Sequence, residues 1–226
     1  MDVGAPKSFV GSYTALSTFK RICEHQAYRR YVVKDIPFEP TPASDWGKHV
    51  HEAMAERVAS KKPLPEDMQQ WEGFAHPFDQ YKIIAERRLG MTAESDPTGY
   101  FDDDVWFRGQ ADLIVMQGDK AYIIDWKTAS SKYEDPFELE TNALLLHTHF
   151  PKLQKIVGSY AWLKENRMSQ VYDCSNFENT FLEIDSLMKQ IAEKRITGQF
   201  EKRKSGLCGW CPVEDCEYFY VSEKRK

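Results

Sequence analysis

The stretch Gly109–Thr128, which reads GQADLIVMQGDKAYIIDWKT, constrains the fold of this chain more than any other. Two apolar runs flank the dipeptide Gly118-Asp119, whose residues suit the tight turn of a β-hairpin. With these two residues at the turn, Asp112 on the first strand falls directly opposite Asp125 on the second. The pattern therefore predicts an antiparallel hairpin that carries one carboxylate on each strand.

Asp112, Asp125 and Lys127 are predicted to converge on one patch of this hairpin, because opposite residues and residues two apart share a face. Two carboxylates that face each other at about 5 Å destabilise a strand pair unless a positive charge lies between them. A divalent cation and one lysine would resolve the conflict, which favours a metal-dependent catalytic hairpin. The alternative is a buried Asp–Lys ion pair with the second aspartate at a strand end.

The composition allows one large domain or a domain with a small appendage, since the 226 residues are 42% hydrophobic. The sequence holds no run of eighteen apolar residues and no apolar signal core, so we expect a soluble intracellular protein. The net charge of −5 does not suggest a nucleic-acid binder. Basic residues are nevertheless clustered, and a groove needs only local positive potential. They are Lys20, Arg21, Arg29, Arg30, Lys194, Arg195, Lys202, Arg203 and Lys204.

Periodicity and capping residues predict an α/β fold in which helices pack on a mixed sheet. Helices are expected over Thr18–Tyr31, Asp45–Ser60, from Glu66 onward, over Pro136–His149 and from Asn176 to about Gly198. Strands are expected over Tyr81–Leu89, Lys155–Lys164 and Ser169–Asp173 in addition to the hairpin. The segment Asp35–Pro42 holds three prolines and is expected to be an extended linker.

His51 lies on the predicted buried face of the helix Asp45–Ser60. A lone histidine on an apolar face is more often a core residue than a metal ligand. Gly47, one turn earlier, would let another element approach closely, which fits a site assembled at this point. His49 falls on the solvent side of the helix.

Five cysteines in a chain without an export signal argue against a disulfide framework. Cys208, Cys211 and Cys216 form a C-x2-C-x4-C motif near the end, whereas Cys23 and Cys174 stand alone. Four thiolates suit zinc or a [4Fe–4S] cluster, and zinc-finger ligands usually come as two close pairs. Zinc in the tail with free thiols at the other two positions is the alternative to a cluster.

Three short blocks resemble the RecB-type branch of the PD-(D/E)XK nucleases: Gly47-x3-His51, Gly109-x2-Asp112 and Asp125-Trp126-Lys127-Thr128. The opening TALSTFKRICEHQAYRRYVV looks like the helix that begins many of those domains. The closing GLCGWCPVEDC is similar to the cysteine tail of iron–sulfur members, including CRISPR-associated RecB-like exonucleases and many phage-encoded relatives. The resemblance implies a restriction-endonuclease-like core, a small mixed sheet flanked by helices. It implies one nuclease domain over residues 1–226, with a cysteine-bound cap from residues 17–31 and 205–220.

The resemblance also assigns roles to residues of the site. His51 matches the metal-binding histidine, Asp112 and Asp125 match the two carboxylates, and Lys127 matches the catalytic lysine. The backbone carbonyl of Trp126 often joins the metal shell in such sites. Glu86 is a possible additional acid of the site, although a surface or paired role is favoured for it. Ala111 stands in place of the family's proline. Glu138 and Asn142 occupy the positions of the family's Gln-x3-Tyr motif.

The function implied by the resemblance is that of a Mg²⁺- or Mn²⁺-dependent DNA exonuclease acting on single-stranded DNA or DNA ends. The resemblance favours a [4Fe–4S] cluster held by Cys23, Cys208, Cys211 and Cys216, with zinc as the lesser alternative and Cys174 as a bystander. Partner proteins of recombination, replication or CRISPR-type complexes are expected, in a bacterial or phage-infected cytoplasm. Two other functions stay open: a non-catalytic DNA-binding subunit and a metal-dependent hydrolase of small phosphorylated molecules.

Overall fold

The chain folds into two compact units in the computed structural model, which describes residues 9–130 and 134–221. The central unit spans Pro40–Leu182, and the terminal unit combines the chain before Pro40 with the chain from Glu183 onward. The predicted hairpin and His51 lie in the central unit. Cys23 and the cysteine motif near the C-terminus lie in the terminal unit.

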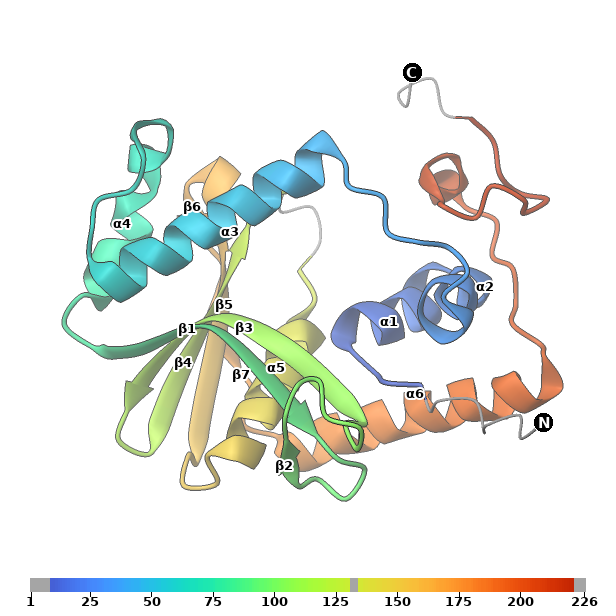
Figure 1. Ribbon diagram of the computed structural model, residues 1–226. Coiled ribbons are helices and arrows are strands. Elements are labelled where there is room, and N and C mark those ends of the chain that lie inside the picture. Colours follow the sequence, from blue (N-terminus) through green and yellow to red (C-terminus); the bar gives the residue numbers. More distant parts are fainter. Residues whose placement is uncertain (1–8, 131–133, 222–226) are drawn as a thin grey trace. The chain divides into compact units, whose positions relative to one another are not determined.

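A seven-stranded mixed sheet forms the central unit, with the order β2-β1-β3-β4-β5-β6 and with β7 paired to β5 (Figure 1). Strands β4 and β5 are parallel, and the other pairs are antiparallel. The predicted α/β class, a mixed sheet flanked by helices, is confirmed. The strand bounds are β1 Lys82–Met91, β2 Pro97–Thr98, β3 Phe107–Gln117, β4 Lys120–Lys127, β5 Lys155–Trp162, β6 Arg167–Met168 and β7 Tyr172–Asp173.

The hairpin of β3 and β4 has the register predicted from its turn residues. Gly118 adopts a positive φ of 64°, which the tight turn requires, and the ladder runs from Gln117–Lys120 to Leu113–Ile124. Asp112 and Asp125 are the next residues in this register, one step beyond the last ladder pair. The two carboxylates therefore lie where β3 and β4 stop pairing.

The side-chain alternation of β3 shifts close to Asp112. Leu113 packs in a core cluster with Val50 and Met54 of the helix α3 (Pro42–Ser60). A Cβ placed on Gly109 would instead lie 2.7 Å from Asn142, which belongs to α5. Residues four apart on a regular strand point to the same face, so the strand changes its facing between these two positions.

Helix α3 begins at Pro42, three residues earlier than predicted, because Thr41 and Ser44 form a capping box in front of it. Helix α5 (Pro136–His149) has the predicted bounds, with the Asp135 side chain accepting a hydrogen bond from Phe137 N. A Cβ on Gly158 of β5 would lie 3.2 Å from the Leu139 side chain, so that glycine lets α5 approach the sheet closely. The remaining helical segments of this unit are short: 3₁₀ turns at Glu66–Trp71, His76–Phe78 and Leu163–Glu165, and α4 at Glu72–Ala75.

The N-terminal segment of the terminal unit is not the single helix predicted over Thr18–Tyr31. Cys23 is extended (φ −163°, ψ 123°) and interrupts the helical path. Its backbone N–H still donates to Thr18 O at 2.9 Å, which closes the preceding π-helical turn. The helical pieces are α1 Tyr13–Ser17, a π-helical turn Thr18–Ile22, α2 Glu24–Ala27 and a π-helical segment Tyr28–Val33.

The C-terminal chain completes the terminal unit. Helix α6 (Phe177–Thr197) has the predicted extent and is followed by Gly198 with a positive φ of 70°. The segment beyond it lies along the N-terminal pieces, since the ring of Phe200 stacks on Tyr28 at 4.2 Å and Arg29 pairs with Asp215 at 2.9 Å. A 3₁₀ turn covers Gly206–Trp210. No helix of the described chain combines the length and apolar character needed to cross a bilayer.

A buried arginine joins α3 to the segment that precedes β1. Arg57 Nε lies 2.7 Å from Glu72, and its two terminal nitrogens contact Asp79 at 2.8 and 3.1 Å. Although burial alone would raise it, a hydrogen bond from Leu64 N and the pair with Arg57 lower the pKa of Glu72. The hydrogen bond from Arg57 also lowers the pKa of Asp79.

Arg57→Met should lower the free energy of unfolding at pH 7 by about 2 kcal/mol, because the half-exposed carboxylates lose a buried partner. Carboxylates with lowered pKa values stabilise the fold above their unfolded pKa, and that stability is lost as the pH falls. Wild type should therefore lose more stability than the variant between about pH 5 and pH 3. Urea unfolding across this range measures both effects, and parallel pH profiles would contradict this role of Arg57.

Candidate metal centre and active site

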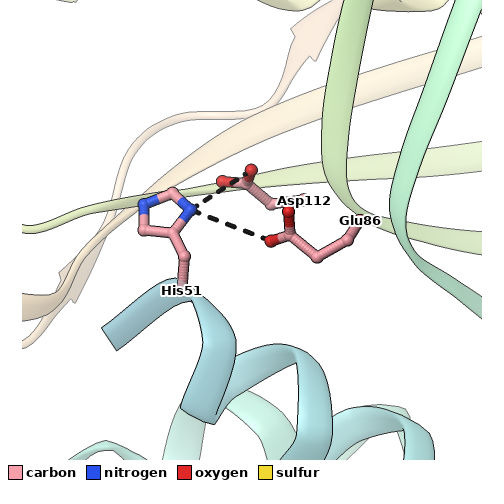
Figure 2. Close-up of side chains that lie close together, drawn as sticks. All are labelled: His51, Glu86 and Asp112. Carbon is pink, nitrogen blue, oxygen red and sulfur yellow. Dashed lines mark ion pairs between the residues drawn. The ribbon is translucent and has the colours of Figure 1, made fainter. Parts of the chain in front are cut away.

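His51, Glu86 and Asp112 come together from α3, β1 and β3, with one ligand atom of each within 4.8 Å of the others (Figure 2). His51 Nδ1 lies 3.3 Å from Asp112 Oδ1 and 3.9 Å from Glu86 Oε1. Gly47 lets the N-terminal half of α3 approach the end of β4, since a Cβ there would lie 3.3 Å from Thr128 Oγ1. The close approach expected at Gly47 is thus present.

This group of three side chains carries more negative charge than it can balance. Burial would lower the pKa of His51, but the hydrogen bond to Asp112 and the nearby carboxylates raise it to about 9. Burial and the charge of Asp112 raise the pKa of Glu86. Within the described chain, buried Glu86 Oε1 accepts no hydrogen bond, while Oε2 accepts one from Gln110 Nε2.

A divalent cation fits this donor set. An unsatisfied buried carboxylate oxygen is costly unless a cation or a donor reaches it. Carboxylate oxygens and an imidazole nitrogen are ligands of divalent cations, whereas soft metals prefer thiolates. Glu86 also has a backbone φ of 49°, an unusual conformation for a residue other than glycine. Such strain is common where function fixes a side chain.

Asp112 connects this group to the second half of the site. Its Oδ2 accepts a hydrogen bond from Trp126 N at 2.8 Å, and only 7% of the residue is exposed. The side chain is thus held between His51 on one side and the backbone of β4 on the other. This hydrogen bond joins β3 to β4 just beyond the last backbone pair of the hairpin, Leu113–Ile124.

Two carboxylates and one aromatic ring surround the ammonium group of Lys127. Its Nζ is 2.8 Å from both Asp125 Oδ1 and Glu138 Oε2, and 5.2 Å from the ring centre of Tyr160. Tyr160 Oη donates to Asp135 O at 2.6 Å, which fixes the ring. Burial would lower the pKa of Lys127, but the two carboxylates raise it. Burial raises the pKa of Asp125 despite the lysine.

The structure brings the predicted site residues into two adjoining sets rather than one. His51 and Asp112 lie together, whereas the carboxyl of Asp125 is directed to Lys127. Glu86, for which a surface or paired role was favoured, belongs to the first set. Its signal in the sequence was an acid following the apolar run Ile83–Ala85, but only the strand register places it opposite Asp112. Glu138 belongs to the second set as the other partner of Lys127.

The four predicted cluster cysteines line one pocket in the terminal unit: Cys23, Cys208, Cys211 and Cys216. All four are half-buried free thiols. Burial, followed by the neighbouring cysteines, raises the pKa of Cys211. Cys174 is buried in the central unit and does not line this pocket, and burial raises its pKa to about 12.

Glu86→Gln should weaken Mn²⁺ binding by about tenfold or more, since the number of charged ligands sets the affinity of such sites. The substitution keeps the shape and an oxygen that can accept the hydrogen bond from Gln110. Electron paramagnetic resonance of free Mn²⁺ measures the affinity without any substrate. Glu94→Gln, at an exposed loop position, is the matched control and should bind as wild type does. Unchanged affinity of Glu86→Gln would place Glu86 outside the metal shell.

Comparisons with known proteins bear on the family and the fold of the chain. A family model described as the PD-(D/E)XK nuclease superfamily matches residues 11–216. The solved structure of a protein named SSO0001 is 14% identical, with a TM-score of 0.52, over 99% of this chain and 89% of that one. A protein of Eubacterium rectale named "putative exonuclease" is 10% identical, with a TM-score of 0.52, over 92% of this chain and 86% of that one. No curated protein sequence matches the chain. At these identities the two structures show the fold alone.

Proposed function

Because the chain belongs to the PD-(D/E)XK nuclease superfamily, we propose that it is a metal-dependent nuclease that hydrolyses phosphodiester bonds of DNA. The observation that carries the proposal is the pairing of the His51–Glu86–Asp112 group with the caged Lys127. A ligand group for a hard cation beside a buried ammonium is what phosphoryl chemistry needs.

The first set of side chains would hold Mg²⁺ or Mn²⁺. His51, Glu86 and Asp112 supply its side-chain donors, and Asp125 with the carbonyl of Trp126 completes the predicted shell. Bound there, the cation would polarise the phosphate and lower the pKa of an attacking water. Asp112 has the further task of fixing β4, through the hydrogen bond to Trp126 N.

Lys127 is proposed as the catalytic cation of the second set. Asp125 and Glu138 hold its ammonium at 2.8 Å each, so the charge is positioned before substrate arrives. A preorganised charge that faces the phosphate stabilises the negative charge that develops on the phosphoryl oxygens. Glu138 stands where many relatives of the resemblance carry glutamine, and we propose that its role here is to position Lys127.

We further propose that the substrate is single-stranded DNA or a DNA end, and that cleavage is exonucleolytic. The name of the Eubacterium rectale protein and the iron–sulfur resemblance support this choice. Recombination, replication or CRISPR-type proteins in a bacterial or phage-infected cytoplasm are the proposed setting. The test uses single- and double-stranded DNA labelled at either end, with Mg²⁺, Mn²⁺ or EDTA. Metal-dependent release of mononucleotides or short products supports the proposal. Metal-dependent binding without cleavage would support a DNA-binding subunit instead.

The cysteine pocket is proposed to hold a [4Fe–4S] cluster that ties the N-terminal segment to the C-terminal tail within the terminal unit. The observation that supports this proposal is that all four cysteines line one pocket. Four thiolates suit such a cluster, with zinc as the lesser alternative.

A further inference from the structure

An arginine–aromatic cluster lies on the extension of β1 and β3 beyond the carboxylate group. Its members are Arg88 on β1, Arg108 on β3, and Tyr100 and Phe101 in the loop after β2. The Arg108 guanidinium carbon lies 4.5 Å from the Tyr100 ring centre, and that of Arg88 lies 5.7 and 5.6 Å from the centres of Tyr100 and Phe101. The two aromatic rings meet edge to face at 4.8 Å.

Phe101 is 71% exposed, although it is a large apolar side chain. An apolar ring left in water beside arginines suits a partner with a flat π-face and a negative charge. Two hydrogen bonds hold the loop in place. Arg108 donates to Tyr100 O at 3.0 Å, and Asp102 accepts from Gly99 N at 2.8 Å. The ring is thus presented on a fixed loop.

Neither arginine of this cluster forms an ion pair with a carboxylate in the described parts of the chain. By contrast, Arg57 and Arg167 each lie within 3.2 Å of acidic side chains. The acidic run that follows Phe101 is partly engaged in the loop itself, since Thr98 Oγ1 bonds Asp104 at 2.6 Å. The two guanidinium groups can therefore form ion pairs with an anionic ligand.

The cluster is connected to the carboxylate group by direct contacts. Arg88 Nε donates to Gln110 Oε1 at 2.9 Å, and Gln110 Nε2 donates to Glu86 of the carboxylate group. Arg108 precedes Asp112 by four residues on β3, or about 13 Å at the rise of a strand. That distance spans about four nucleotides of a stacked strand, or fewer if the strand is extended.

We propose that this arginine–aromatic cluster binds unpaired nucleotides of the DNA strand next to the cleavage site. A base stacks on Phe101, and Arg88 contacts the neighbouring phosphate. The inference rests on the proposed nuclease function and adds a binding surface for its proposed single-stranded substrate: bases inside a duplex are already stacked on both faces and leave none for the ring. The acidic run beside the loop makes stacking, rather than charge alone, the main source of affinity.

The test measures binding of a fluorescein-labelled oligothymidylate by anisotropy in EDTA, so that no cleavage occurs. Phe101→Ala should weaken binding roughly 5- to 100-fold. The same substitution should leave unchanged the binding of an oligonucleotide of equal length whose bases are removed. Arg88→Gln should weaken binding of both strands and reduce the slope of log Kd against log salt by about one.

Matched controls at the opposite end of β1 are Tyr81→Ala, an exposed aromatic, and Lys82→Gln, an exposed charge, and both should bind as wild type does. Equal affinity of wild type and Phe101→Ala, or an equal loss on the normal and abasic strands, would overturn the inference. If the wild type cleaves DNA and Phe101→Ala binds the oligonucleotide as tightly as wild type does, only the proposed role of this cluster is refuted. A wild type that neither binds nor cleaves DNA refutes the proposed function itself.

Discussion

Lys127→Ala should reduce metal-dependent DNA cleavage by at least about 10²–10³-fold, the usual cost of removing one preorganised group that stabilises developing charge. The expectation follows from the cage in which Asp125 and Glu138 hold the ammonium at 2.8 Å. Asp112→Asn should be at least as severe, because it changes a carboxylate of the metal group and the partner of Trp126 N. Single-turnover cleavage of end-labelled single-stranded DNA with saturating Mg²⁺ measures both.

Folding must be checked separately for Lys127→Ala, because the variant leaves the buried Asp125 without its partner and breaking a buried pair is costly. Lys127→Arg keeps the charge and provides a second variant, which should fold but cleave poorly because the guanidinium has another shape. Lys120→Ala removes a lysine at the other end of β4, where it is exposed, and should cleave normally. Cleavage at the wild-type rate by a folded Lys127→Ala protein would refute the proposed mechanism.

The hairpin could be predicted because its turn residues determine its register. Gly118 supplies the positive φ of the tight turn, and the position of this turn fixes which residues of the two strands pair. Asp112 and Asp125 follow from that register by counting. No comparable local signal places His51 beside them, since α3 reaches the hairpin through tertiary packing. Its role as a metal ligand is implied by the family resemblance alone, and the structure places its ring 3.3 Å from Asp112.

Glu86 shows what sequence periodicity cannot provide. The strand β1 pairs with β3 across a long loop, so no turn chemistry sets its register. The left-handed backbone at Glu86 also breaks the alternation on which a strand prediction depends. The interruption at Cys23 has the same character, because the helical period continues through it in the sequence while the backbone becomes extended. Both departures occur at side chains of the two proposed sites.

Cys23→Ser should cause loss of iron from protein purified without oxygen, in which wild type should hold about four irons per chain. Cys23 is remote in sequence from the other three cysteines but lines the same pocket. Its backbone is extended (φ −163°, ψ 123°), a conformation that serine adopts equally well. A failure to retain iron would therefore report the lost ligand rather than a strained backbone.

The same substitution should lower stability strongly, because a cluster that joins Cys23 to the tail closes a loop of nearly the whole chain. A disulfide of similar span would contribute about 4–5 kcal/mol by the chain-entropy estimate, which sets the scale for this crosslink. Cys174→Ser removes a thiol outside the pocket and should retain all the iron. Iron and zinc analysis with visible absorption decides the result. One zinc without iron in the wild type, or full iron retention by Cys23→Ser, would refute the cluster, whereas the proposed nuclease site contains no cysteine and would stand.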